Sequence, residues 1–84
     1  MVLAVSLGMK FRYLRDRHNN RLHIWNRHKL TQKEVELAFS HVISEYRDED
    51  NAWVKTCTAA NQQKMEIVYI KHSDHVFIIT AYYV

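Results

Sequence analysis

Two successive periodicities of apolar residues predict an α+β fold, with two N-terminal helices packed on a three- to four-stranded antiparallel sheet. Up to residue 46, the apolar residues recur every three to four positions, as they do along amphipathic helices. From residue 53, they alternate with a period of two, as they do in strands. The connections between the alternating runs are short, which favours an antiparallel meander. A chain of 84 residues has room for one such domain, residues 1–84.

Residues 1–8 precede these elements and are mostly apolar. We expect them to form an extra edge strand or a flexible arm. They lack the basic region and the apolar length of a signal peptide, and they are shorter than the ~20 residues that span a bilayer. No membrane role is therefore expected.

The first helix is predicted from Arg15 to His28. Leu22, Trp25 and His28 recur there at helical spacing. The run is short and carries no capping signal, so its apolar stripe is the only pattern that indicates a helix.

The second helix is predicted from Gln32 to about Tyr46. It begins with a capping box, in which Thr31 and Glu34 each accept a hydrogen bond from the other's backbone N–H. Polar turn-forming residues after Tyr46 interrupt the stripe and end the helix. The buried stripe is predicted to comprise Val35, Ala38, Phe39, Val42, Ile43 and Tyr46.

Three strands are predicted after the helices. They are Trp53–Ala59, Met65–His72 and His75–Tyr83, with the central strand at Lys64–Lys71. A tight hairpin closed by His72 and His75 joins the last two. Both faces of these two strands are apolar, so the helices should cover one face, and a second copy, a partner protein or the N-terminal strand should cover part of the other.

Charge is distributed unevenly along the chain. Residues 10–33 hold eight basic residues against Asp16 alone, a net charge of +7, whereas residues 34–50 hold six acidic residues against Arg47, a net charge of −5. A basic surface attracts phosphates and favours contact with nucleic acid, if its side chains converge on one face. The alternative is a solvated surface that the acidic segment partly neutralises.

Short motifs in the two halves resemble a known family. They are His23, the run Arg27-His28-Lys29-Leu30-Thr31 with the helix start Gln32–Val35, and the closing strand Val76–Tyr82. Over residues 10–83 the chain resembles the BrnT-like toxins and related small domains of the RelE/ParE superfamily. The resemblance implies an endoribonuclease-like fold that cuts RNA without a metal, and a small antitoxin encoded beside it that neutralises the toxin. Tyr82 stands where these toxins carry an arginine.

Metal-free RNA cleavage needs a base, an acid and a cation that stabilises the crowded phosphate. Imidazoles titrate near neutral pH and can serve as either base or acid. The predicted catalytic residues are His28, His72, His75 and Tyr82, and the predicted RNA-binding residues are Arg27, Lys29 and Lys71.

No metal ion or other cofactor is expected. On a helix, His23 and His28 lie about 140° apart around the axis and cannot share a tetrahedral ion. His72 and His75 can come together in a tight turn, but no further ligand is fixed near them in the sequence. The single cysteine, Cys57, lies inside an alternating strand and should pack as a small hydrophobic residue in a reducing, cytoplasmic setting.

Two classes of function fit these observations. The first is a toxin-type, metal-free endoribonuclease, or a degenerate relative that only binds RNA, with RNA and an antitoxin protein as partners. The alternative is a non-catalytic, small dimeric interaction domain. In either case the small core favours a homodimer or a tight partner complex, in which residues such as Phe77 and Tyr83 take part.

Overall fold

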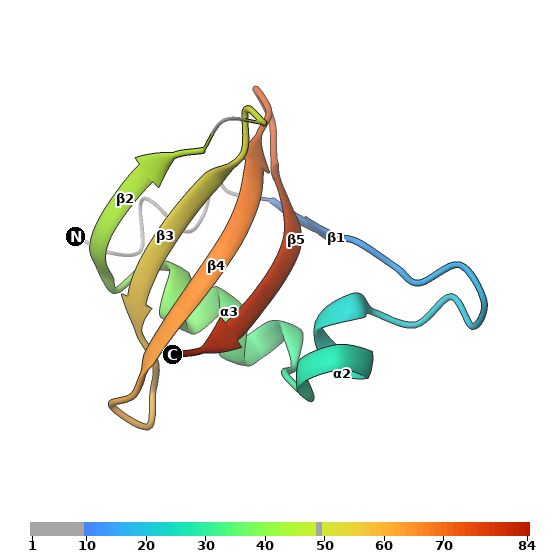
Figure 1. Ribbon diagram of the computed structural model, residues 1–84, viewed down its shortest axis with the longest axis horizontal. Helices are drawn as coiled ribbons and strands as arrows, with labels where there is room; N and C mark the ends of the chain where they lie inside the picture. The colour runs from blue at the N-terminus through green and yellow to red at the C-terminus, as the bar shows by residue number, and fades with distance from the viewer. Residues whose placement is uncertain (1–9, 49) are drawn as a thin grey trace.

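The computed structural model describes residues 10–48 and 50–84 and forms one mixed sheet with two helices (Figure 1). In chain order the elements are β1 (Phe11–Tyr13), α2 (His23–His28), α3 (Gln32–Phe39), β2 (Val42–Arg47), β3 (Trp53–Thr58), β4 (Lys64–Lys71) and β5 (Val76–Tyr83). The strand order is β1-β5-β4-β3-β2, and only the β1–β5 pair is parallel. The prediction for residues 1–8 falls outside the described residues.

The α+β class and the three C-terminal strands are confirmed, and β4 is the central strand. The predicted number and order of elements are wrong, because the sheet has five strands and β1 precedes both helices. β1 pairs with the edge of β5, and the ladder is flanked by backbone hydrogen bonds from Val76 N to Lys10 O and from Leu14 N to Ile78 O, both 2.9 Å. Three residues are too few to display an alternating period, so the sequence pattern did not reveal this strand.

The predicted end of the second helix is also wrong. α3 ends at Phe39, where the Ser40 hydroxyl donates to Leu37 O at 3.0 Å and His41 N donates to Ala38 O at 2.9 Å. Val42–Arg47 forms strand β2 instead and pairs antiparallel with β3. Val42, Ile43 and Tyr46 are β-branched or aromatic and favour a strand, although their spacing along the sequence is also compatible with a helix.

The first helix is shorter than predicted. Only His23–His28 is helical, and residues 14–22 form a loop that projects from the body of the molecule (Figure 1). Asp16 N donates to Arg21 O at 2.9 Å, and an isolated bridge joins Arg15 to Leu22. α2 ends at Lys29, whose φ of 57° is left-handed and stops the helix.

The core lies between α3 and the sheet. The predicted capping box is present, with Glu34 N donating to the Thr31 hydroxyl at 3.2 Å and Thr31 N donating to Glu34 Oε1 at 3.0 Å. The Phe39 ring packs edge-on against Tyr69, with centroids 4.9 Å apart. Residues of β4 that face α3 are fully buried, namely Met65, Ile67 and Tyr69. Burial of this kind contributes about 1.5–3 kcal/mol for each large side chain.

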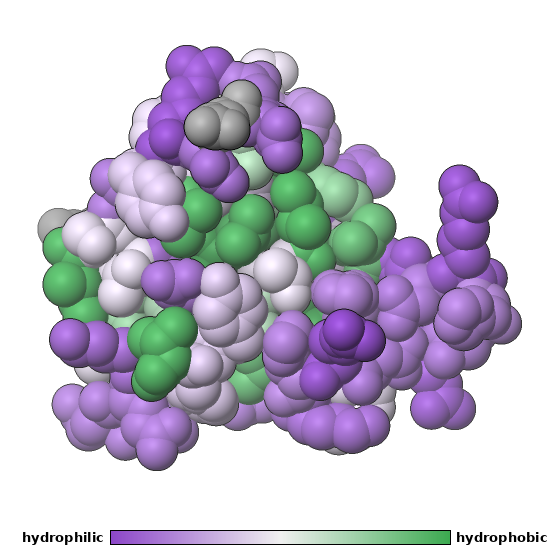
Figure 2. Space-filling model, viewed as in Figure 1, coloured by the Kyte–Doolittle hydropathy of each residue, from purple (hydrophilic) through white to green (hydrophobic). Residues whose placement is uncertain are grey.

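The opposite face of the sheet is seen in Figure 2, where apolar side chains gather over the central strands and hydrophilic ones surround them. Strand alternation and register place Val54, Val68, Ile70 and Phe77 on this face. Val54 is buried and the other three are half-buried. No helix among the described residues is long and apolar enough to cross a membrane.

Candidate functional site

Three aromatic rings come together where α2 packs beside the C-terminal half of β5. The rings of His23 and His28, at the two ends of α2, have centroids 6.2 Å apart and are nearly perpendicular. The His28 ring lies 5.7 Å from the ring of Tyr82. Ile24, only 1% exposed, anchors the helix in the core and so fixes both histidines against β5. We call Asp16, His23, Asn26, His28 and Tyr82 the α2 site.

Asp16 orients one of these histidines from the projecting loop. Its Oδ1 lies 3.0 Å from His23 Nδ1, and its Oδ2 accepts a hydrogen bond from Asn26 Nδ2 at 2.7 Å. The bonds from Asn26 and then His23 lower the pKa of Asp16, so the carboxylate is ionised. An ionised carboxylate can only accept, which puts a proton on His23 Nδ1 and leaves Nε2 as the reactive atom.

The surroundings of His28 favour its neutral form, which can act as a base. Burial lowers the pKa of His28, and the positive charges of His23 and Arg27 lower it further. The ring is therefore neutral at neutral pH and has a nitrogen lone pair with which to take a proton. The two histidines at the ends of α2 thus lie in different environments, which is how acid and base roles are separated in general acid–base catalysis.

Tyr82 supplies an aromatic surface rather than a mobile proton. Its hydroxyl donates to Glu66 Oε1 at 2.6 Å. This bond, followed by burial, raises the pKa of Tyr82 to about 12. The phenol therefore stays protonated and committed to Glu66, while its ring stands beside His28.

Basic side chains are frequent on the two segments that carry the α2 site. All are exposed and come from the projecting loop and from α2 with its C-cap; they are Arg15, Arg17, Arg21, Arg27 and Lys29. We call this set the basic rim. Lys29 Nζ lies 5.4 Å from the centre of the Trp25 ring, and Arg15 Nη1 donates to Asn20 O at 2.8 Å. The predicted RNA-binding residues Arg27 and Lys29 thus adjoin the predicted catalytic residue His28.

The other two candidate histidines close the β4–β5 hairpin, as predicted. His72 N donates to His75 O at 2.9 Å, and the two rings stack with centroids 4.4 Å apart. His75 Nδ1 lies 2.7 Å from Asp74 Oδ1, a hydrogen bond that lowers the pKa of Asp74. We call His72 and His75 the hairpin pair.

The structure does not bring the hairpin pair to the α2 site. His75 precedes β5 and Tyr82 lies near its end, so at ~3.3 Å per residue they are roughly 23 Å apart along the strand. The four predicted catalytic residues therefore form two separate pairs at opposite ends of β5. Periodicity locates residues along a strand but does not show which end of a hairpin a helix will cover.

Lys71 lies with the hairpin end and away from the basic rim. Its Nζ is 3.9 Å from the centre of the Trp53 ring and 3.8 Å from Glu45 Oε1. Lys55 Nζ lies 3.9 Å from the other oxygen of Glu45, and burial lowers the pKa of Lys55. Lys71 is thus engaged in a mixed aromatic and ionic cluster on the helix-bearing side of the sheet.

Sequence reasoning missed Asp16 and Asn26 and did not assign His23 a catalytic role. Asp16 and His23 are seven residues apart, and the projecting loop brings them together. One signal was available, because Asp16 is the only acidic residue among the eight basic residues of the segment 10–33. A lone carboxylate in such a segment is a natural partner for a histidine or arginine.

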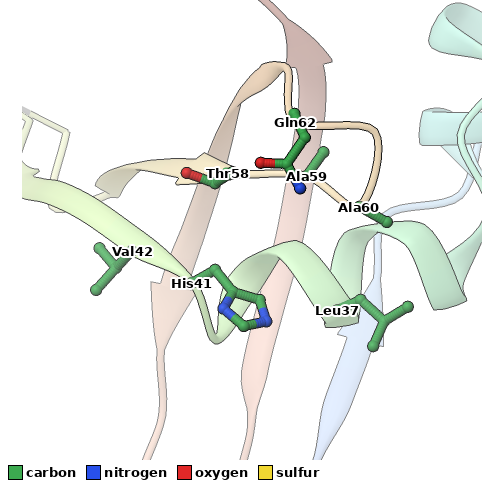
Figure 3. Close-up of a pocket in the computed structure, with 7 residues that line it drawn as sticks. All are labelled: Leu37, His41, Val42, Thr58, Ala59, Ala60 and Gln62. Atoms are coloured by element: carbon green, nitrogen blue, oxygen red, sulfur yellow. The ribbon is translucent and has the colours of Figure 1, made fainter.

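Other chemical groups form no second acid–base site among residues 10–48 and 50–84. Cys57 is fully buried, as predicted, and burial raises the pKa of its thiol to about 11. No group of three or more histidine, cysteine or acidic residues in the described part of the chain could hold a metal ion. A pocket of about 510 Å³ lies between α3 and the β3–β4 turn (Figure 3), but His41 is the only titratable residue among the described residues that line it.

No family model, curated protein or solved structure matches the chain. The functional assignment therefore rests on the geometry and electrostatics of the α2 site. The resemblance to BrnT-like toxins stays a prediction.

Proposed function

We propose that this chain is a metal-free endoribonuclease of the toxin–antitoxin type, or a relative that retains RNA binding, and that the α2 site is its active site. The observation that carries the proposal is the Asp16–His23 hydrogen bond beside a second histidine, His28, whose pKa is lowered. Two imidazoles with different environments and a cation nearby are what acid–base cleavage of RNA requires.

In the proposed reaction, neutral His28 takes the proton of a ribose 2′-hydroxyl. The 2′-oxygen forms a bond to the adjacent phosphorus while the bond from phosphorus to the 5′-oxygen breaks. The acid is the doubly protonated form of His23: it keeps its Nδ1 proton, hydrogen-bonded to Asp16, gives its Nε2 proton to the departing 5′-oxygen and becomes neutral. The products are a 2′,3′-cyclic phosphate and a 5′-hydroxyl end, so atoms and charge balance without a co-reactant.

The ring spacing supports this assignment. An acid and a base must each reach the reacting oxygens within ~3 Å, on either side of one phosphate. With ring centroids 6.2 Å apart and nearly perpendicular, a phosphate bound beside both rings would be within reach of a nitrogen atom of each. The basic rim would hold the phosphate backbone, and the Tyr82 ring would offer a surface on which a base can stack.

The toxin role follows from the resemblance and is part of the same proposal. A cytoplasmic RNA-cutting protein has to be neutralised by a partner, and the partner's reading frame is expected beside that of the toxin. Induced expression should arrest growth, and co-expression with the neighbouring small protein should restore it.

The decisive experiment incubates purified protein with a single-stranded RNA oligonucleotide at low salt in EDTA. Cleavage to a 2′,3′-cyclic phosphate is expected, and an oligonucleotide with 2′-deoxyribose throughout should remain intact. A protein that neither cuts nor binds this RNA would overturn the proposal.

A second function, that of a non-catalytic interaction domain, is favoured by a different observation. All six residues of β2 are exposed, and three of them are large and apolar: Val42, Ile43 and Tyr46. Failure of the RNA experiment together with stable self-association would favour this function.

A further inference from the structure

The sheet has one long edge that pairs with nothing among the described residues. β2 is the last strand in the order β1-β5-β4-β3-β2 and bonds only to β3. Val42, Ile43 and Tyr46 of β2 are 52%, 53% and 55% exposed. Long bare edges with apolar residues invite pairing with another strand, and natural proteins usually blunt them.

The backbone groups that point away from β3 can be identified. Asp48 N donates to Ala52 O at 2.7 Å, so Asp48 belongs to a hydrogen-bonded pair that faces β3. Hydrogen-bonded and non-hydrogen-bonded pairs alternate in an antiparallel ladder. Ser44 and Tyr46 therefore also bond to β3, and the N–H and C=O groups of Glu45 and Arg47 point to the open edge.

Symmetry restricts how two β2 strands can pair. Residues directly opposite in an antiparallel pair lie on the same face, so a two-fold axis must pass between a residue and its own copy. An axis at Glu45 places two carboxylates opposite each other. An axis at Ser44 places Glu45 opposite Ile43, which lies in the irregularity between Val42 and Ser44.

An axis at Tyr46 avoids both problems. It places Glu45 opposite the partner copy's Arg47, and these are the residues whose backbone groups face the edge. Both side chains lie on the helix-bearing face. Glu45 pairs with Lys55 and Arg47 with Trp53, which in turn pair with Ile67 and Tyr69 of β4, and these two residues face α3. Opposite charges and aromatic pairs placed directly across strands stabilise a sheet.

We propose that two copies of this chain pair antiparallel through β2, with the two-fold axis at Tyr46, to form a continuous ten-stranded sheet. Glu45 and Arg47 of each copy exchange backbone hydrogen bonds and form an ion pair across the axis, and the two Tyr46 rings meet on the opposite face. The partner is therefore a second copy of this chain. The proposal is tested separately from the ribonuclease function, because its experiments measure self-association and not RNA cleavage or binding.

Cysteine substitution tests the register directly. The two Tyr46 positions form a non-hydrogen-bonded pair, whose Cα atoms are ~4.5 Å apart and within the range of a disulfide. Under mild oxidation, Tyr46→Cys should form a disulfide-linked dimer at least about ten times faster than Ser44→Cys, Glu45→Cys or the remote surface variant Lys33→Cys. Native Cys57 is buried and should leave the wild-type protein monomeric on a non-reducing gel.

Charge reversal tests the same interface without a cross-link. Arg47→Glu places like charges opposite Glu45 twice in each dimer and should weaken the dimer, measured by sedimentation, about tenfold or more. Arg12→Glu makes the same change in β1, the strand at the other edge, and should leave the dimer unchanged. A wild-type protein that is monomeric at hundreds of micromolar would overturn the proposal, as would fastest cross-linking at Ser44→Cys or Glu45→Cys.

Discussion

Two histidine pairs lie at opposite ends of β5, and their surroundings differ more than their spacing. The rings of His23 and His28 are 6.2 Å apart, and those of His72 and His75 are 4.4 Å apart. Each pair has one aspartate, Asp16 at 3.0 Å and Asp74 at 2.7 Å. By distance alone, the hairpin pair is the tighter site.

The two pairs differ in the arrangement of their rings and in the cations near them. The hairpin pair is stacked nearly face to face, with 14° between ring planes, so its rings occupy the space that a phosphate would need. The α2 rings are nearly perpendicular, and the exposed residues of the basic rim lie on the same helix, on its C-cap and on the loop before it. The nearest cation to the hairpin in sequence, Lys71, is engaged with Glu45 and Trp53. Lys10 contributes to the lowered pKa of Asp74, so the hairpin pair also has a cation nearby, and the arrangement of the rings is the clearer difference between the two pairs.

The largest expected difference is in cleavage rate. His28→Ala removes the proposed base and should lower kcat by ~10²–10⁴-fold. His75→Ala removes an equivalent ring from the hairpin pair and should change kcat by less than about twofold. Initial rates on one RNA oligonucleotide, with circular dichroism to confirm folding, make the comparison. Equal losses in both variants would contradict the assignment.

The two aspartates provide the next comparison. Asp16→Asn keeps the size of the side chain but no longer fixes the tautomer of His23, so kcat should fall about tenfold or more. Asp74→Asn makes the same change in the hairpin and should leave kcat unaltered. Asp16→Glu should recover part of the activity if orientation of His23 is the cause, and a variant Asp16→Asn with full activity would exclude this role.

Substitution of two lysines shows whether RNA binds at the α2 site or at the hairpin end. Lys29→Ala should weaken RNA binding several-fold at low salt and reduce the salt slope by ~0.7, the value for one phosphate contact on a single strand. Lys71→Ala should leave the affinity and the slope unchanged, because Lys71 belongs to the Glu45 cluster. Fluorescence anisotropy over a range of salt concentrations measures both quantities. A larger effect from Lys71→Ala would move the RNA site to the hairpin end.

The smallest expected effect concerns stability and pH. The pKa of His28 is below its ordinary value of 6.5 in the folded chain, so the unfolded chain binds this proton first as pH falls. The free energy of unfolding should therefore decrease as pH falls below about 6.5. His28→Gln should show a weaker decrease in urea denaturation at pH 7.5 and 5.5. An identical pH dependence in the two proteins would show that His28 is not shielded from solvent.

Much of the C-terminal half of the fold was predictable, because long strands display their period. β4 and β5 each have eight residues; β4 alternates throughout and β5 alternates on either side of a register shift, and a capping box marks the start of α3. The boundary between α3 and β2 was not predictable, because the spacing of Val42, Ile43 and Tyr46 suits a helix and a strand equally. Pairing with β3 decides between them, and pairing is a property of the whole sheet.

Part of the candidate site could be predicted from the sequence, namely the part whose residues are neighbours along the chain. His28, Arg27 and Lys29 are adjacent in sequence, so local reasoning finds them together. The contact of His28 with Tyr82 and the bond of Asp16 to His23 depend on how the projecting loop and α2 fold against β5. Those long-range contacts, and the separation of the hairpin pair from them, required the structure.

The proposed function requires that RNA contacts the α2 histidines and not the hairpin pair. It is tested by following the imidazole proton resonances of the wild-type protein while adding an RNA oligonucleotide with 2′-O-methyl riboses, which cannot be cleaved by attack of the 2′-oxygen. Single His→Gln variants assign the resonances. The resonances of His23 and His28 should shift in a saturable manner, while those of His72 and His75 should stay in place. Shifts confined to His72 and His75 would contradict the proposed site.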